Sequence, residues 1–425
     1  MKQHSQTAQG KRPSFRSGAS NGATPAGVRN YNERLVLSVI KNEGQVASAQ
    51  IARLTSLSAQ TASNITRSLE ADGMLLRGTP QRGRVGKPSV PVYLNPEGSL
   101  AYGLRVGRRG ADLVLMNIIG SVIDTRSVRY DYPVPEAIDA FVAEGMASME
   151  DVLPVPLRAR IVGIGVAMPF GLWHKPEAAG APPGVMDAWR GHDFVESFAR
   201  FTRLPVLVAN DASMGCSGEL IFGAGEALSD FLYFYVGAFV GGGVVLDGKV
   251  FFGKRGNAGA MGTVLVDGLA AEPNQLVHRA SIYVLEQELS QTSGRDVRLR
   301  MDSPEWTLED PRIDAWTQAT AQALASAAVS SAALVDVDTV VVDGGFPASI
   351  KDAVINRMRV ALENVDMMEI RPVRVHAGVL GRISAAMGAA YQPILGAHFL
   401  EGSKLGAFSP TILAANVTPE ESLIV

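Results

Sequence analysis

Apolar residues recur at helical spacing in three successive segments near the start of the chain, and each segment is bounded by a start or stop signal. The first stripe lies within residues 33–41. Ser48 and Ser58 precede the second and third segments and suit the N-cap position of a helix. Gly73 follows the third segment, as a C′ glycine does. We therefore expect three short helices, whose inward positions are Leu35, Val36, Val39 and Ile40, then Ile51, Ala52 and Leu54, and then Ala62, Ile65 and Leu69.

Two short β-rich runs follow these helices. They are residues 74–77 and 90–94, and the basic loop 78–88 lies between them. Helix, helix, tight turn, helix and basic hairpin is the order of a winged helix-turn-helix. In that motif the third helix enters the major groove of DNA, and the loop reaches the flanking backbone or the minor groove. The pattern predicts a DNA-binding domain over residues 29–97.

The polar positions of this domain match the chemistry of base and phosphate recognition. Gln and Asn suit adenine, Arg suits guanine, and a Thr methyl group can meet thymine. Basic side chains on a glycine-rich loop suit phosphates or a narrow minor groove. Taken singly, each residue is better explained by a solvated helix face or an ordinary basic loop, so the whole arrangement carries the prediction. The predicted DNA-binding residues are Gln60, Thr61, Asn64 and Arg67 on the helix and Arg82, Arg84 and Lys87 in the loop.

Charge divides the chain at nearly the same place. Residues 1–90 contain 13 Lys or Arg and 4 Asp or Glu, whereas the remaining 335 residues contain 26 and 38. A basic module joined to an acidic body favours a polyanion as the partner of the module. Residues 1–28 have almost no large apolar side chains, so we expect a disordered basic arm there.

Composition excludes several classes of protein. A single cysteine, Cys216, cannot form an internal disulfide or supply a thiolate zinc cage. No N-terminal stretch has the basic-then-apolar layout of a signal peptide. The most apolar run, residues 231–246, is too short and too glycine-rich to span a bilayer. We expect a soluble protein of the bacterial cytoplasm.

From residue 98 onward, β-rich runs joined by glycine turns give way to strands that alternate with long helices. This mixture predicts an α/β body of two lobes with a cleft between them. We expect Gly241-Gly242-Gly243 between two paired strands and Asp247-Gly248 as a hairpin turn. The expected strands are 101–106, 111–116, 122–130, 160–167, 204–209, 231–235, 243–246 and 339–342, and the expected helices are 135–153, 194–201, 211–222, 274–289, 314–334, 349–362 and 380–391.

Several motifs resemble the ROK family, which joins sugar kinases to sugar-responsive transcriptional repressors. The resemblance covers about residues 30–395. It implies an actin-like, ribonuclease-H-like two-lobed ATPase fold behind the winged helix, which repressors of the family carry. The motifs are the wing 83–88 leading to Tyr93-Leu94-Asn95-Pro96, the strand start 102–107, the segments 162–169 and 204–206, Asn210-Asp211, Gly218-Glu219 and Gly253–Gly262.

The phosphate-binding motif departs from the family's kinases. Where those begin their first hairpin with an aspartate and a Gly-Gly-Thr turn, this chain has Arg105 and then Gly107-Arg108-Arg109. Arginine cannot ligate Mg²⁺, and metal neutralisation of the phosphates is central to the transfer. Gly241-Gly242-Gly243 and Asp343-Gly344-Gly345 resemble the family's other phosphate and nucleotide loops, although glycine turns also persist for backbone reasons alone. We therefore expect no kinase activity and no cofactor.

The sugar-binding motif is only partly kept. By resemblance, Asn210 and Asp211 are the pair that binds sugar hydroxyls, although Asn-Asp is also a common helix start. The family's Glu-x-Gly-His segment has become residues 260–263, in which Gly262 survives, and a later Glu has become Val277. A standard hexose should fit badly, because buried polar pairings strongly select ligands. The predicted ligand-binding residues are Asn210, Asp211, Gly262 and Trp189, which lies near the family's tryptophan by the cleft, while the bulky Phe170 narrows the pocket.

The family's structural zinc site is also altered. Its histidine is Thr263 here, and the loop from Asp267 to Asn274 contains no cysteine. His278 lies nearby, and packing or surface exposure explains it better than ligation. We expect no metal.

Together these observations predict a transcriptional repressor. Its winged helix binds a double-stranded operator, and its body binds a sugar or sugar derivative and forms a homodimer or homotetramer. One alternative is an ATP-dependent sugar kinase with an accessory DNA-binding domain, and another is a ligand-independent regulator whose body serves only for dimerisation. The expected boundaries are 1–28 for the arm, 29–97 for the winged helix-turn-helix, 98–208 plus 380–398 for the small lobe, 209–379 for the large lobe and 399–425 for a tail.

Overall fold

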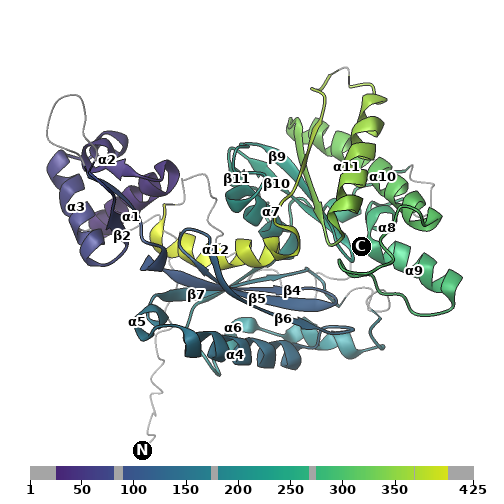
Figure 1. Ribbon diagram of the computed structural model, residues 1–425, viewed down its shortest axis with the longest axis horizontal. Coiled ribbons are helices and arrows are strands. Elements are labelled where there is room, and N and C mark those ends of the chain that lie inside the picture. The colour runs from purple at the N-terminus through teal and green to yellow at the C-terminus, as the bar shows by residue number, and fades with distance from the viewer. Residues whose placement is uncertain (1–24, 81–89, 174–179, 268–273, 368, 401–425) are drawn as a thin grey trace, which may run out of the picture.

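The chain forms a small helical unit joined to a larger body of two lobes, as the computed structural model shows (Figure 1). The helical unit, in purple, lies to one side, and helices α7 (Asp211–Phe222) and α12 (Ser384–His398) run between the two sheets of the body (Figure 1). The structure describes residues 25–80, 90–173, 180–267, 274–367 and 369–400.

Three helices and a three-stranded antiparallel sheet make up the helical unit. Their apolar stripes meet in one core, where Val36, Ile40 and Ile51 are completely buried. Strand β3 pairs with both β1 and β2. The predicted order of helices and flanking strands is confirmed, and the loop tip at 81–89 lies outside the described residues. The bounds are α1 Pro25–Glu43, β1 Val46–Ala47, α2 Ser48–Thr55, α3 Ala59–Ala71, β2 Leu75–Arg77 and β3 Pro91–Leu94.

The predicted capping residues are confirmed for α3, and the one predicted for α2 is wrong. Ser58 caps α3, because its Oγ accepts a hydrogen bond from the backbone N–H of Thr61 at 3.0 Å. Gly73 follows the C-cap of α3 with φ of 71°, the conformation that favours glycine. Ser48 is not a cap but the first residue of α2, because the pairing of β1 with β3 continues to the preceding Ala47. Leu54 is 49% exposed, since the short α2 buries only Ile51.

Helix α1 begins earlier than the sequence pattern indicated. It starts at Pro25, whereas we expected a disordered arm as far as residue 28. Proline suits the first turn of a helix, where its missing N–H would have no partner within the helix. Apolar periodicity alone does not detect this turn, in which Val28 is 44% exposed.

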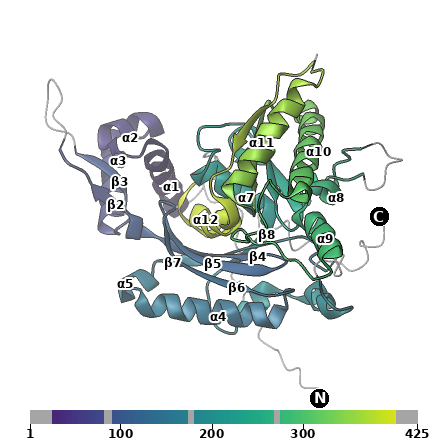
Figure 2. The same ribbon diagram turned by 45° about the vertical axis from the view of Figure 1, so that its right-hand side comes forward.

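A five-stranded mixed sheet forms the small lobe, with the strand order β6-β5-β4-β7-β8. One face is covered by α4, α5 and α6, and the other by α12 (Figures 1 and 2). Buried side chains such as Leu104, Leu113 and Val142 fill the first of these layers. The bounds are β4 Leu100–Val106, β5 Gly110–Asn117, β6 Val122–Arg129, α4 Pro135–Val152, α5 Val155–Arg158, β7 Ile161–Met168, α6 Phe194–Phe198 and β8 Val206–Asn210.

A second five-stranded sheet forms the large lobe, with the order β11-β10-β9-β12-β13. Helices α8 to α11 cover its outer face, where Leu285, Trp316 and Ile350 pack into one core. Two mixed sheets with crossed central helices confirm the predicted two-lobed, actin-like body. The bounds are β9 Phe231–Val236, β10 Val240–Leu246, β11 Lys249–Val250, α8 Val277–Ala280, α9 Ile282–Ser293, α10 Pro311–Val335, β12 Thr339–Gly344, α11 Ala348–Glu363 and β13 Arg374–Ala377.

Glycines allow α12 to approach its neighbours at backbone distance. A Cβ atom added at Gly165 of β7 would lie 1.9 Å from the carbonyl oxygen of Ala389 in α12. One added at Gly388 of α12 would lie 1.9 Å from the carbonyl oxygen of Met214 in α7. No side chain could move aside to relieve either contact, so α12 is held tightly against both the sheet and α7.

Three details of the body differ from the sequence-based expectation. Gly241-Gly242-Gly243 lies within strand β10, paired with β9, rather than in a connecting loop. The helix expected over 274–289 is divided into α8 and α9 at Ser281, whose Oγ accepts the N–H of Val240. Helix α12 extends to His398 and Phe399 is buried, so the expected tail from 399 begins too early.

Candidate functional site

Helix α3 presents a polar face to solvent. Gln60, Asn64 and Arg67 are exposed along this face, and Thr61 is half-buried. The side-chain oxygen of Asn64 accepts hydrogen bonds from Gln60 Nε2 at 2.9 Å and from an Arg67 guanidinium nitrogen at 2.6 Å. The structure therefore places these four predicted residues on one face. Arg82, Arg84 and Lys87 lie outside the described residues.

The polar face of α3 has the groups that base reading requires. Gln60 and Asn64 lie one helical turn apart, and each carries both a hydrogen-bond donor and an acceptor. The Oδ1 atom of Asn64 would exchange its two internal partners for a base edge on binding adenine. Thr61 is tied to the cap, because its hydroxyl lies 2.8 Å from the Ser58 hydroxyl. The face is thus prearranged by hydrogen bonds between neighbouring turns.

A cavity of about 280 Å³ lies where the two lobes meet. The turn after β4, the start of α7, the β9–β10 hairpin and the residues just before α12 all contribute to its wall. Of the predicted ligand-binding residues, Asn210, Asp211 and Gly262 line it, and Trp189 does not. The altered family positions 260, 263 and 277 also line it, as does Phe170.

Asn210 and Asp211 mark the start of α7. The side-chain oxygen of Asn210 caps the helix by accepting the N–H groups of Ala212 and Ser213 at 3.0 and 3.2 Å. Asp211 accepts the same Ala212 N–H at 2.9 Å. Burial raises the pKa of Asp211, and the nearby guanidinium of Arg105 opposes that rise. Asn210 therefore has a structural role, whereas the Asp211 carboxyl group can also meet a ligand in the cavity.

Three arginines also line the cavity, and two of them share one buried carboxylate. Asp112 of β5 is completely buried and lies 3.1 Å from a guanidinium nitrogen of Arg105 and 3.1 Å from one of Arg382. The Ser127 hydroxyl donates to the same carboxylate at 2.7 Å. Arg105 and Asp112 face each other across the pairing of β4 with β5. Arg105, which stands where the family resemblance predicts an aspartate, is thus matched by an acid on the neighbouring strand.

Arg108 is held differently. Its guanidinium carbon lies 4.2 Å from the ring centre of Phe239, and one guanidinium nitrogen donates to the carbonyl of Leu172 at 3.3 Å. Sequence reasoning treated Arg105 and Arg108 only as losses of kinase chemistry, and it missed Arg382 entirely. Arg382 stands just before the terminal helix, but only the fold shows that this position faces the cleft.

Trp189 corrects one prediction. Its side chain is 3% exposed in the small lobe, with Nε1 donating to the carbonyl of Pro133 at 2.9 Å. The indole packs among aromatic rings, including those of His192 and Phe194. Burial of a large ring in this aromatic cluster explains the residue, so it is part of the core rather than of the cleft.

The glycines that resemble nucleotide loops have packing roles. An added Cβ would lie 2.6 Å from Cys216 at Gly243 and 2.3 Å from Met261 at Gly242. Asp343, which precedes the other glycine pair, is completely buried and accepts bonds from Lys351 Nζ at 3.2 Å and from the N–H of Gly381 at 2.6 Å. These contacts satisfy the carboxylate within the protein.

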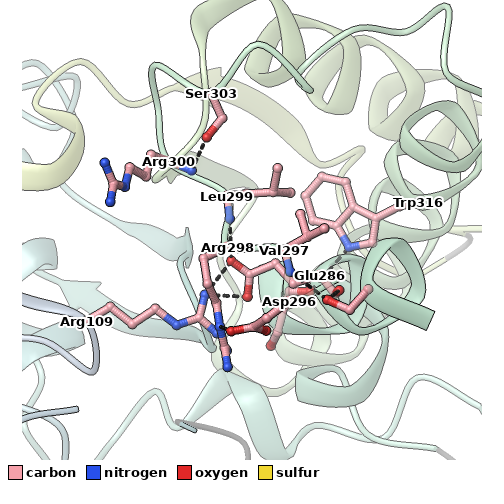
Figure 3. Close-up of polar contacts among 11 residues, drawn as sticks. Arg109, Glu286, Asp296, Val297, Arg298, Leu299, Arg300, Ser303 and Trp316 are labelled. Atoms are coloured by element: carbon pink, nitrogen blue, oxygen red, sulfur yellow. Dashed lines mark hydrogen bonds and ion pairs between the residues drawn. The ribbon is translucent and has the colours of Figure 1, made fainter. Parts of the chain in front are cut away.

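A second ion pair joins the two lobes beside the cleft. Arg109, on the turn of the small lobe, donates to the carboxylate of Glu286 in α9 of the large lobe (Figure 3). Glu286 is almost fully buried and also accepts the N–H of Leu299 at 2.8 Å. A cavity of about 210 Å³ lies here, lined in part by Ser290 and Arg298. The pair is a direct polar connection between the lobes.

Helix α12 connects the cleft with the helical unit. Its first residues, Ser384 and Ala385, line the large cavity. At its other end, Arg34 of α1 donates to the carbonyls of Phe399 at 2.9 Å and Gly396 at 3.1 Å. Figure 2 shows α1 lying directly against this end of α12. One helix therefore lines the cleft and also contacts the helical unit that carries the polar face of α3.

Neither a metal site nor a membrane span is found in the described part of the chain. No group of three His, Cys, Asp or Glu side chains lies close enough there to hold a metal ion. His278 Nδ1 is hydrogen-bonded to the Tyr283 hydroxyl at 2.7 Å. None of the helices described is both long and apolar enough to cross a bilayer. The expectation that the protein holds no metal stays a prediction.

Comparison with known proteins gives a family match over most of the body. The model described as "ROK family" matches residues 101–392. The xylose repressor of Bacillus subtilis is 23% identical over 240 residues, which cover 56% of this chain and 62% of the repressor. This chain thus spans about three fifths of the length of the curated relatives it matches.

Solved structures share the fold. A ROK family transcriptional regulator, a homologue of the Escherichia coli MLC protein, superposes with a TM-score of 0.65 at 17% identity and covers 87% of this chain and 97% of its own. A ROK family glucokinase from Streptomyces griseus, solved with glucose and AMPPNP, superposes at 0.53 and 21% identity, covering 69% of this chain and 98% of its own. The regulator thus covers a larger share of this chain than the kinase does.

Proposed function

The chain belongs to the ROK family, and from that premise we propose that it is a DNA-binding transcriptional regulator, a repressor, of the bacterial cytoplasm. Its helical unit binds a double-stranded DNA operator through α3 and the following loop. Its body binds a small carbohydrate-like effector in the cleft and associates as a homodimer or homotetramer. The xylose repressor of Bacillus subtilis, to which the chain is similar, supports this assignment.

One observation carries the proposal: α12 lines the cleft at its start and holds α1 of the helical unit at its end. A ligand changes DNA affinity only if it binds two conformations of the protein differently. A helix that lines the cleft and contacts the helical unit supplies a physical connection for such a difference. A regulator whose body served only for dimerisation would not require this connection.

The junction of α12 with α1 is packed closely enough to transmit a movement. Leu400 N–H donates to the Ser38 hydroxyl at 3.1 Å, and the Lys41 ammonium lies 5.6 Å from the ring centre of Tyr391. Burial lowers the pKa of Lys41 to about 8. A shift of α12 would therefore move α1, and with it the position of α3 relative to DNA.

The second candidate is an ATP-dependent sugar kinase, and Asp211 is the observation that favours it. A carboxylate at the cavity wall could accept a proton from a sugar hydroxyl. Arg105 opposes this function, because it stands where an acid would be expected beside the metal-bound phosphates. An ATPase and phosphotransfer assay over a panel of sugars decides between the two. Phosphorylation of any sugar that is lost in Asp211→Ala would establish the kinase.

The regulator is tested by selecting binding sites from random duplex DNA and then measuring affinity by electrophoretic mobility shift. Asn64→Ala should lower discrimination between the selected and random sites by about 1–3 kcal/mol, the range for a lost base contact. Asn356→Ala is a matched control, because Asn356 in α11 is exposed and also accepts from an arginine three residues later, Arg359. Failure to select any sequence, or equal discrimination by both variants, would contradict the proposal.

A further inference from the structure

The charged groups on the wall of the cleft are not those of a neutral sugar site. Among the described residues that line the cavity, three are arginines, at 105, 108 and 382, and one is a carboxylic acid, Asp211. Neutral sugar hydroxyls require both donors and acceptors, whereas a guanidinium group only donates. Three of them together favour acceptors that carry negative charge.

Each arginine has a partner within the protein before any ligand arrives. Asp112 lies behind Arg105 and Arg382 and is completely buried, so it holds both guanidinium groups without itself lining the cavity. The aromatic face of Phe239 holds Arg108. Because the side chains are already ordered, less conformational entropy is lost when they bind an anion.

Arg108 has N–H donors that are available to a ligand. Within the described residues, Arg108 makes one hydrogen bond, to the Leu172 carbonyl, and so four of the five N–H groups of a guanidinium have no protein acceptor. Burial lowers the pKa of Arg108, and the Asp211 carboxylate opposes that shift. A second anion near Arg108 would relieve the cost of keeping this cation away from water.

Part of the remaining wall is apolar. Residues 260, 263 and 277 are Ala, Thr and Val, and the phenyl ring of Phe170 adds apolar surface. Burial raises the pKa of Tyr235 to about 12, so its hydroxyl stays protonated at neutral pH and can donate. The wall therefore combines the arginine donors with hydroxyl groups and apolar surface.

Size restricts the ligand further. The cavity of about 280 Å³ lies at the lower end of the range of roughly 300–1,000 Å³ for small-molecule sites. That volume suits a monosaccharide derivative better than a nucleotide. Asp343, which ends β12, is bound to Lys351 and to backbone N–H groups and offers nothing to a nucleotide.

We propose that the effector is an anionic monosaccharide derivative, whose carboxylate or phosphate is bound by Arg105, Arg108 and Arg382. This inference rests on the proposed function, because it names the chemical class of the effector of that same cleft. Arg382 lies in the short 3-10 helix Gly381–Ile383, which leads directly into α12. Partial transfer of Arg382 from Asp112 to the ligand anion would act on the end of the helix that reaches α1.

The test measures binding to the full chain by calorimetry at constant ionic strength, without DNA. Gluconate, glucuronate and glucose 6-phosphate are compared with neutral glucose and xylose, and inorganic phosphate and ATP are separate arms. We expect at least one of the acids to bind at least tenfold more tightly than the neutral sugars. The carboxylate and phosphate arms distinguish the two sources of the negative charge.

Variants localise the binding. Arg108→Gln and Arg382→Gln should each raise the Kd of the acid at least tenfold, while Arg108→Lys and Arg382→Lys, which keep the charge, should lose less. Arg200→Gln is the matched control, because Arg200 is exposed on the same lobe, forms no ion pair in the described residues, and should bind within twofold of the parent. Melting temperatures without ligand identify any variant that fails to fold, and the lysine variants then carry the test.

Several results would overturn the inference. These are equal binding of neutral sugars and acids, parent affinity in both glutamine variants, binding of none of the acids, preference for ATP, or a response to inorganic phosphate equal to that of the acids. Failure of the proposed function is separable. Acid binding by a protein that selects no DNA would refute the regulator alone, and an operator complex released by a neutral sugar would refute the anionic effector alone.

Discussion

The two ends of α12 lie in opposite environments. At its start, Arg382 is 44% exposed and shares the buried Asp112 with Arg105 beside an open cavity. At its end, Phe399 is buried against the ring of Tyr391, and Arg34 binds backbone carbonyls. The first end has charged groups that can exchange partners, whereas the second is closed by packing and by hydrogen bonds to the main chain.

This difference teaches where a signal can enter and where it can only be transmitted. Because Arg382 shares Asp112 with Arg105, its exposed guanidinium can bind an anion from solution without leaving that carboxylate unpaired. The hydrogen bonds of Arg34 to backbone carbonyls cannot be exchanged without separating α1 from the body. We call the end of α12 beside Arg382 its open end, and the end at Phe399 its closed end. The middle of the helix and each of these ends are tested in turn.

The largest effect is expected at the crossing of α12 with α7. Gly388→Ala should lower the free energy of unfolding by at least about 3 kcal/mol, the upper range for overpacking, because the new Cβ meets a backbone carbonyl at 1.9 Å. Gly396→Ala in the same helix is the control. It has open space, and so it should be neutral or slightly stabilising. Urea denaturation measures both, and equal stabilities would show that α12 is not tightly held.

At the closed end, Arg34→Ala should lower the free energy of unfolding by about 2 kcal/mol, because it removes charge-assisted hydrogen bonds to the carbonyls of Phe399 and Gly396. Operator affinity should persist, while its response to the effector becomes weaker. The ratio of operator affinities with and without effector measures that response. Arg29→Ala, in the exposed first part of α1, should leave the ratio unchanged. An unchanged ratio in Arg34→Ala would separate α12 from regulation.

At the open end, Asp112→Asn should weaken effector binding about tenfold, equivalent to about 1.4 kcal/mol. Asp112 does not line the cavity, so the loss would come from freeing Arg105 and Arg382 to adopt other conformations. Asp112→Asn should keep its affinity for the operator, because the helical unit is untouched. Calorimetry with the acid that binds the parent checks the first point. Parent affinity in this variant would show that Asp112 does not position the arginines.

The smallest effect concerns pH at the closed end. Burial, with the charges of Arg34 and Arg160, lowers the pKa of His398 from 6.5 to about 4. The folded protein then resists protonation that the unfolded chain accepts, so stability present above pH 6.5 is lost as the pH falls toward 4. Between pH 6.5 and 5.5 this group should contribute a loss of about 1 kcal/mol. The contribution of His398 is measured as the difference in unfolding free energy between the parent and His398→Gln at each pH. If the unfolding free energies of the two proteins changed in parallel with pH, the prediction would be contradicted.

Local sequence signals predicted much of the fold. Ser58 and Gly73 bound α3 because both act through their own backbone neighbours. The limits of α7, Asp211 and Phe222, were predicted to the residue, since Asn-Asp is a strong helix start. Ser48 was misassigned because the preceding residue belongs to a strand whose partner lies more than forty positions away. Local patterns do not contain that pairing.

The candidate site was less predictable. Asp211 and Gly262 were found through motifs, and the structure places both on the cleft. Trp189 has the right residue type near the right position, but its ring turns into the core. Arg382 was invisible, because its importance depends on Asp112, which is 270 positions earlier in the chain. A motif identifies a residue, whereas the direction of a side chain depends on partners that only the folded chain brings near.

The docking of α12 on α1 also has a consequence for biosynthesis. Residues 34 and 399 are joined by a hydrogen bond across a sequence separation of 365. A ribosome releases the helical unit long before it releases α12, and domains generally fold in the order in which they emerge. The helical unit therefore exists for most of translation without its contact to the cleft. Any nascent chain that reached DNA during that interval would be unable to respond to effector.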